Sequence, residues 1–260
     1  MARQRKEEPA DTLDELESLG ERLMQWIGAN PLPVLGAALL ILVLAAAVGG
    51  YRAYAGSRAS RASAALASLH TELVVAMGGK PTEDAVPEPA NPETARTVRT
   101  QFADRYLALA KDWSGTPAQG LALLQAGDLF DQLGNTDRAL EVWTEAVGAT
   151  SSHSPTLGIL QSRVATLDEE KGDFEAAARA HGAAAAVPGF PLAATALADA
   201  ARCWAQAGKD DAALAAYRRL KSDYPDYHVP PYVEAKLSEL EVRAGGSPAA
   251  ASPPPAAANP

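Results

Sequence analysis

The side chains best suited to chemistry are few and scattered along this chain of 260 residues. The single cysteine, Cys203, excludes an internal disulfide and, on sequence pattern alone, a Cys-based metal site. The four histidines have none of the H-x₃-H or H-E-x-x-H spacings that place two metal ligands on one helix face; they are His70, His153, His181 and His228. No Gly-rich phosphate loop is present. The sequence therefore predicts no catalytic, cofactor-binding or metal site, and no enzyme.

Three local features have a chemical and a plainer interpretation. "SSHS" at 151–154 invites a serine–histidine relay, but sequence neighbours rarely form one, so we predict a polar loop between helices. The acidic run 168–170 suits a metal, yet "KGD" follows it, which favours a solvated helix end. Cys203 lies between Arg202 and Trp204 on a predicted helix, where a packed small hydrophobe is expected rather than a reactive thiol.

The most apolar segment, from Leu32 to Tyr51, contains 20 apolar or small residues, and no charge occurs between Arg22 and Arg52. At 1.5 Å per helical residue it would extend about 30 Å, the thickness of a bilayer's hydrocarbon core. Trp26 and Tyr54 flank it, as interfacial aromatic residues do. We predict a transmembrane helix at 31–51 in contact with the lipid bilayer. A cleaved signal peptide and a buried core helix are the alternatives.

The flanking charges bear on those alternatives and on orientation. Seven acidic residues against four basic ones precede the apolar segment, unlike the short basic region of a signal peptide, although Ala45–Ala47 offers a cleavage-like site. Arg52, Arg58 and Arg61 follow the segment, and the positive-inside rule would place the remainder in the cytoplasm. Orientation therefore stays open at this point.

Composition indicates an all-α protein, because alanine dominates and runs of β-branched and aromatic residues are missing. A net charge of −9 argues against nucleic-acid partners. We divide the chain into six parts: 1–30, an acidic polar head with a short amphipathic helix (Leu13 to Ile27, begun by a capping box at Thr12–Glu15); 31–51, the transmembrane helix; 52–77, its helical continuation; 78–92, a Pro/Gly/acidic loop; 93–243, a repeat domain; and 244–260, a disordered Ala/Pro tail.

The repeat domain contains three helix–Gly–helix segments, whose turn glycines Gly134, Gly172 and Gly208 are 38 and 36 residues apart. This spacing is close to the 34 residues of tetratricopeptide repeats. Small, aromatic and alanine residues recur at the packing positions of the outer two segments; they are Gly127, Phe130, Ala139, Trp143, Ala201, Trp204, Ala213, Tyr217 and Pro225. The middle segment is degenerate, with Asp168 and His181 at positions that favour bulky apolar residues. We predict a tetratricopeptide-repeat-like solenoid, closed by a helix at 230–243.

The order of acidic head, apolar segment, "YRAYAGSRASRASAALASL" and degenerate repeats resembles a bacterial family, the ancillary subunit of the Sec translocon. The resemblance implies a single-pass inner-membrane protein whose repeats face the periplasm. It also implies two protein partners, the translocon and a periplasmic chaperone, and a role in the folding of exported proteins. The alternative is a cytoplasm-facing scaffold that tethers a soluble complex to the membrane. Oligomeric state and partner identity are beyond the sequence.

Partner binding in this repeat class uses the inner face of the first helix of each pair. By alignment, that face holds an acidic-to-mixed groove suited to an apolar or basic segment. Its predicted residues are Leu121, Leu124, Asp128, Asp131, Gln132, Thr166, Glu169, Glu170, Arg202 and Gln206. A merely solvated concave face remains the alternative.

Overall fold

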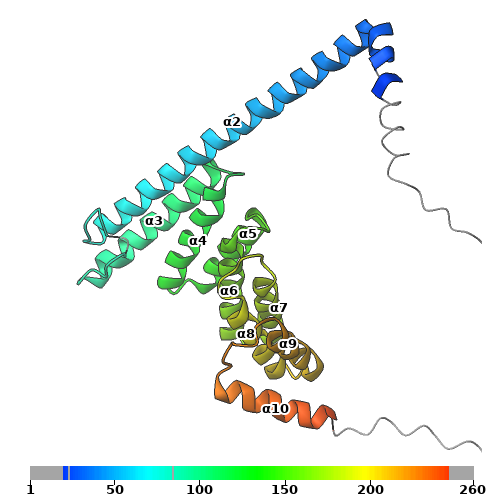
Figure 1. Cartoon of the computed structure of the whole chain (residues 1–260). Coiled ribbons are helices and arrows are strands. Elements are labelled where there is room, and N and C mark those ends of the chain that lie inside the picture. Colours follow the sequence, from blue (N-terminus) through cyan, green and yellow to red (C-terminus); the bar gives the residue numbers. More distant parts are fainter. Residues whose placement is uncertain (1–19, 23, 84, 246–260) are drawn as a thin grey trace, which may run out of the picture. The chain divides into compact units, whose positions relative to one another are not determined.

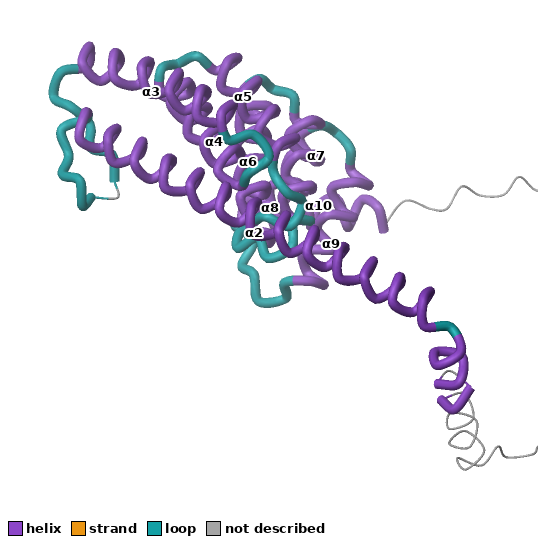
Figure 2. The backbone as a smooth tube through the Cα atoms, turned by 90° about the horizontal axis from the view of Figure 1, so that it is seen from above, coloured by secondary structure: helices purple, strands orange, loops and turns teal. Residues whose placement is uncertain are grey.

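The computed structural model describes residues 20–22, 24–83 and 85–245, and within these ranges it contains helices and no strand (Figures 1 and 2). Residues 20–22 and 24–29 are helical. The capping box, most of the expected amphipathic helix and the tail from 246 onward lie outside the described residues. The helices that follow are α2 (Pro31–Ala76), α3 (Pro92–Asp112), α4 (Pro117–Gln132), α5 (Thr136–Ala149), α6 (Pro155–Glu170), α7 (Phe174–Ala185), α8 (Ala193–Gln206), α9 (Asp210–Asp223) and α10 (Pro231–Gly245).

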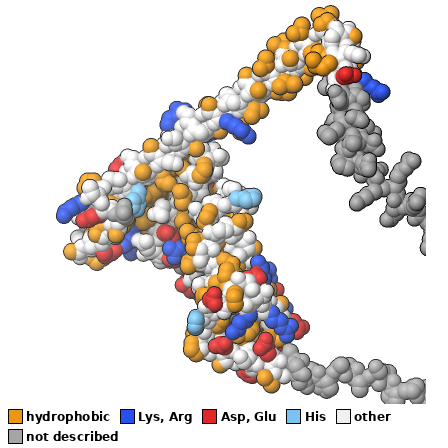
Figure 3. Space-filling view, viewed as in Figure 1, with side chains coloured by type: hydrophobic (Ala, Val, Ile, Leu, Met, Phe, Trp, Pro, Cys, Tyr) orange, Lys and Arg blue, Asp and Glu red, His pale blue; other side chains and the backbone are white. Residues whose placement is uncertain are grey.

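Helix α2 begins in the apolar segment and continues unbroken for 46 residues. None of its residues from 31 to 51 is buried, which contradicts a buried core helix, and hydrophobic side chains cover this part in Figure 3. An 18-residue stretch of α2 has a mean hydropathy of 2.6. Among the described helices, α2 is the one that is long and apolar enough to cross a membrane. The last turns differ, because Leu69 and Leu73 are buried and belong to the core of the repeat domain.

Three of the helix pairs are hairpins with the same turn: α4–α5, α6–α7 and α8–α9. Their turn residues Gly134, Gly172 and Gly208 have φ of 74°, 79° and 69°, a left-handed conformation that glycine adopts without steric cost. The last turns of α2 pack with α3 ahead of these hairpins, and α10 follows them. The described chain is therefore all-α, with a tetratricopeptide-repeat-like solenoid of helical hairpins, as the sequence predicts.

The packing inside the first hairpin explains why small residues recur. A Cβ added to Gly127 on α4 would lie 2.2 Å from the indole Nε1 of Trp143 on α5, so only glycine lets the two helices approach this closely. Trp143 is 1% exposed, and its Nε1 donates a hydrogen bond to the carbonyl oxygen of Leu124 at 3.2 Å. The indole thus fills the interface without leaving a buried donor unpaired.

Most of the predicted packing residues are buried, namely Phe130, Ala139, Trp143, Ala201, Ala213 and Tyr217. Trp204 is half-buried and packs against the apolar core that contains Ala201, Ala213 and Tyr217. Pro225 departs from the prediction, since it is exposed. It stands two residues after α9 ends at Asp223, where a residue without an N–H and with a fixed φ ends the helix rather than filling the core.

Candidate interaction groove and inter-repeat network

The predicted groove residues lie on the first helices of the hairpins, α4, α6 and α8, but they differ in accessibility. Thr166, Asp131 and Glu170 are exposed, and Leu121 is 37% exposed. Leu124 is 6% exposed, which corrects its assignment to the groove, because its side chain belongs to the core that also holds Trp143. The exposed subset therefore remains available to a partner, whereas Leu124 does not.

Three of the charged groove members pair with side chains of neighbouring repeats, whereas Asp131 and Glu170 remain exposed. Asp128 of α4 pairs with Arg163 of α6 at 3.2 Å, and Glu169 of α6 pairs with Arg202 of α8 at 2.7 Å. Gln132 accepts a hydrogen bond from Arg99 of α3 at 2.9 Å. The partners in these links are 33 to 35 residues apart, one repeat length. We call this series the inter-repeat ladder.

Further rungs of the same period join the turn of one hairpin to the second helix of the preceding hairpin. Lys171 contacts Asp137 at 2.7 Å, and Lys209 contacts Glu175 at 3.6 Å. These pairs are largely exposed, so solvent screening makes each contribute little to stability. Opposite charges one repeat apart are readable in a sequence, and this periodicity is the signal that the sequence prediction missed.

Glu169 is the most heavily bonded member of the ladder. Its Oε2 accepts from Nη1 of Arg202 at 2.7 Å, and its Oε1 accepts from Nη2 at 2.9 Å, a bidentate geometry that planar guanidinium favours. Arg202 also donates to Gln206 at 3.2 Å and to Asp199 at 3.2 Å. Glu169 and Arg202 thus fix the position of α8 against α6. This corrects the expectation of a fully solvated acidic helix end for Glu169.

Two further groups meet at the Glu169 carboxylate. Nε2 of His181 on α7 lies 2.8 Å from its Oε1, and Sγ of Cys203 on α8 lies within 4.8 Å of the carboxylate. His181 and Cys203 are both buried. The repeat pattern favours a bulky apolar residue at position 181. His181 is instead a buried polar side chain that has a hydrogen-bond partner.

The environment sets the protonation of these groups. Burial opposes ionisation of Glu169, but hydrogen bonds from Arg202 and His181 outweigh it and lower its pKa to about 2. The bonded carboxylate stabilises the fold above its ordinary pKa of 4.5, and this stabilisation is lost as the pH falls toward 2. Burial raises the pKa of the Cys203 thiol to about 12, so this thiol is neutral and unreactive at pH 7.

Asp128 shows the opposite balance in the ladder. Burial raises the pKa of its carboxyl group, and Arg163 only partly offsets that effect. The guanidinium of Arg163 also lies 5.9 Å from the centre of the Trp143 ring. The Asp128–Arg163 pair thus lies beside the apolar core of the first hairpin.

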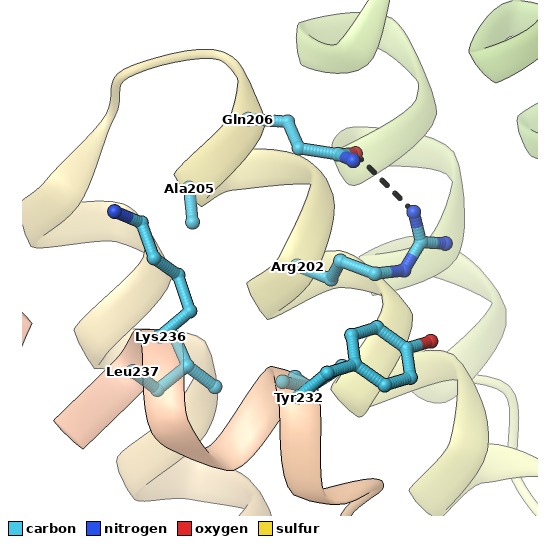
Figure 4. A pocket seen from close by; sticks show the side chains of 7 residues that line it. Arg202, Ala205, Gln206, Tyr232, Lys236 and Leu237 are labelled. Carbon is cyan, nitrogen blue, oxygen red and sulfur yellow. Dashed lines mark hydrogen bonds between the residues drawn. The ribbon is translucent and has the colours of Figure 1, made fainter. Parts of the chain in front are cut away.

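A pocket of about 200 Å³ lies between α8 and α10 (Figure 4). Arg202 and Gln206 line it from α8, joined by the hydrogen bond drawn in the figure. Tyr232, Lys236 and Leu237 line it from α10, and the ring of Tyr232 is 69% exposed. The sequence prediction placed Arg202 and Gln206 in the groove but missed the contribution of α10.

Comparison with known families identifies a repeat in the last hairpin. Residues 196–227, which include most of α8 and all of α9, match the family model described as tetratricopeptide repeat. A crystal structure from Podosopora anserina, described as nearly identical TPR-like repeats of a kinesin light chain, is similar at 14% identity with a TM-score of 0.41. That similarity covers 59% of this chain and 84% of the other. No curated protein matches the chain. Repeats of this kind indicate a scaffold for protein–protein interaction.

Proposed function

We propose that this protein is a membrane-anchored module for protein–protein interaction. The observation that carries the proposal is the unbroken helix α2, whose residues 31–51 are apolar or small and not buried, while its last turns join a repeat core. An exposed apolar stretch of this length is unfavourable in water and favourable in a bilayer. The anchor keeps the repeats at a membrane, where they bind a partner.

Part of the accessible surface of this groove is apolar, beside the exposed carboxylates of Asp131 and Glu170. The charges of Asp128, Glu169 and Arg202 are already paired within the chain, so they contribute position more than affinity. Exposed apolar side chains remain at corresponding places on the first helices, with Leu121 on α4 and Ile159 on α6 at 37% and 41% exposed. An apolar segment of a partner chain is the ligand that this surface fits best.

We further propose that the repeats face the periplasm and assist the Sec translocon and a periplasmic chaperone in folding exported proteins. The resemblance of the chain to the ancillary translocon subunit supports this assignment. A cytoplasm-facing scaffold is the second candidate, and the three arginines that follow the apolar segment support it, because such residues are retained on the cytoplasmic side.

Sidedness separates the two candidates. In a Cys203→Ala background, Ser222→Cys places an exposed thiol on α9, and Glu21→Cys places one before the apolar segment. A membrane-impermeant maleimide should label the Ser222→Cys variant in intact spheroplasts and the Glu21→Cys variant only after lysis. The reverse pattern would establish the cytoplasmic scaffold, and release of both variants into the soluble fraction would refute the anchor.

Partner binding is tested in the groove itself. The double variant Leu121→Asp, Ile159→Asp should lose co-purification with the translocon and chaperone in detergent extracts. The matched control Asp131→Asn, Glu170→Gln changes exposed charges on the same helices and should retain it. Equal recovery from both variants would exclude the apolar face as the binding surface, and recovery of neither partner by the wild type would exclude the translocon assignment.

A further inference from the structure

Three side chains of metal-ligand type converge from three successive helices. Glu169 of α6, His181 of α7 and Cys203 of α8 each bring one ligand atom to a group in which all the atoms lie within 4.8 Å of one another. Among the described residues this is the one group of at least three such side chains. Oxygen, imidazole nitrogen and thiolate sulfur together are the donor set of zinc-like ions.

Burial makes this cluster different from an ordinary surface group of polar residues. His181 is 5% exposed and Cys203 is 0% exposed. Nε2 of His181 is bonded to Glu169, but its Nδ1 is buried and has no hydrogen-bond partner among the described residues. Nε2, the nitrogen that faces the Glu169 carboxylate, is therefore the ring atom that an ion at this cluster would bind.

Arg202 is compatible with an ion at this position. A carboxylate offers about four lone-pair positions, and Arg202 uses one on each oxygen. The position on Oε1 that His181 now occupies is the one that an ion would share with His181 and Cys203. Asp199, 3.2 Å from Arg202, balances the guanidinium, so the formal charges of a divalent ion, Glu169 and the Cys203 thiolate cancel within the filled site.

We propose that Glu169, His181 and Cys203 form a binding site for a divalent zinc-like ion at the junction of the second and third hairpins. Protein ligands lie about 2.0–2.3 Å from zinc, so ligand atoms less than 4.8 Å apart need only small adjustments to share an ion. Glu169 and Arg202 are partly exposed and provide the route of entry. On binding, the Cys203 thiol releases its proton to solvent.

The sequence prediction of no metal site missed this cluster because its members have no common local spacing. They are 12 and 22 residues apart and come from three different helices, so only the folded hairpins bring them together. A filled site would connect α6, α7 and α8 through bonds stronger than the present hydrogen bonds. The ion would therefore stabilise the two hairpins that support the groove.

Cobalt(II) is the probe, because zinc has no visible spectrum whereas cobalt bound to a thiolate gives a charge-transfer band. The full chain is purified in detergent, stripped with a chelator and titrated with Co²⁺, and the band is then bleached with Zn²⁺. The variants are Cys203→Ala and His181→Gln, and the matched control is His153→Gln in the exposed loop after α5. Circular dichroism checks that each variant is folded.

The expected result is one equivalent of Co²⁺ per chain with a charge-transfer band that Zn²⁺ removes. Cys203→Ala should abolish the band, His181→Gln should weaken binding at least tenfold, and His153→Gln should change neither. A wild type without the band, or His181→Gln binding as tightly as wild type, would overturn the proposal. If Cys203→Ala does not fold, the wild type decides alone: one equivalent of Zn²⁺ must raise its melting temperature, and an unchanged melting temperature would overturn the proposal.

Discussion

The first hairpin and the junction of the second and third hairpins solve the same packing problem with different chemistry. In the first, Trp143 fills the space that Gly127 leaves, and almost every contact is apolar. In the junction, Glu169, Arg202 and His181 form directional bonds beside a small apolar cluster of Ala177, Ala178 and Cys203. A change of side-chain volume should destabilise the apolar interface, whereas loss of a hydrogen-bonding partner should destabilise the polar junction. The two interfaces should therefore fail in different ways.

The largest expected effect is loss of the indole from the first hairpin. Trp143→Ala should destabilise the fold by about 3–5 kcal/mol, because it removes a fully buried side chain and leaves a cavity. Urea unfolding of the chain in detergent, followed by circular dichroism, measures this change. The control Trp113→Ala removes a half-buried indole at the end of α3 and should cost clearly less. Equal losses would mean that burial of Trp143 is not what stabilises the hairpin.

The polar junction is tested by removing one charge without changing size. Glu169→Gln should cost about 2 kcal/mol, because Arg202 then keeps a partly buried charge with weaker partners. Part of this loss should disappear in the double variant Glu169→Gln, Arg202→Gln, a double-mutant cycle that isolates the pair. The neighbouring exposed Glu170→Gln is the control and should be nearly neutral. Strict additivity would show that the two side chains are not coupled.

Overpacking gives a smaller effect at a second close contact. A Cβ on Gly158 of α6 would lie 2.5 Å from the ring of Phe190, so Gly158→Ala should cost about 1–3 kcal/mol. Gly182 of α7 has nothing within 4 Å of the corresponding position, and Gly182→Ala should instead stabilise by up to about 1 kcal/mol. Melting temperatures of the two variants should therefore move in opposite directions. Shifts of the same sign would refute the packing account.

The smallest effect concerns Tyr106, which is 0% exposed and whose hydroxyl has no partner among the described residues. Burial raises its pKa to about 12. Tyr106→Phe should be neutral or stabilise by about 1 kcal/mol, since it removes a buried hydroxyl that lost its hydrogen bonds to water. Tyr232→Phe on the exposed face of α10 should not change stability. A clear loss of stability in Tyr106→Phe would mean that the hydroxyl is bonded in solution.

Sequence periodicity was sufficient for the fold because each hairpin is built from local signals. The turn glycines and the buried alanines Ala139 and Ala213 recur at repeat spacing, and helices of this kind form from contacts close in sequence. The groove was only partly predictable. Alignment placed Glu169 and Arg202 on the correct helices, but whether such charges face solvent or pair with the next repeat depends on side-chain packing. The assignment of Leu124 to the groove was wrong for the same reason, since a small rotation about the helix axis decides whether a side chain enters the core or faces solvent.

The ladder also constrains how this array could change by recombination. Repeat arrays gain and lose units by unequal exchange, which works when neighbouring units are interchangeable. Arg163, the partner of Asp128, stands nine residues before Gly172, and the residue nine before Gly208 is Asp199. Excision of the second hairpin would thus set Asp128 against Asp199 and leave two acids facing each other. The Asp128–Arg163 pair therefore opposes removal of the second hairpin from this array.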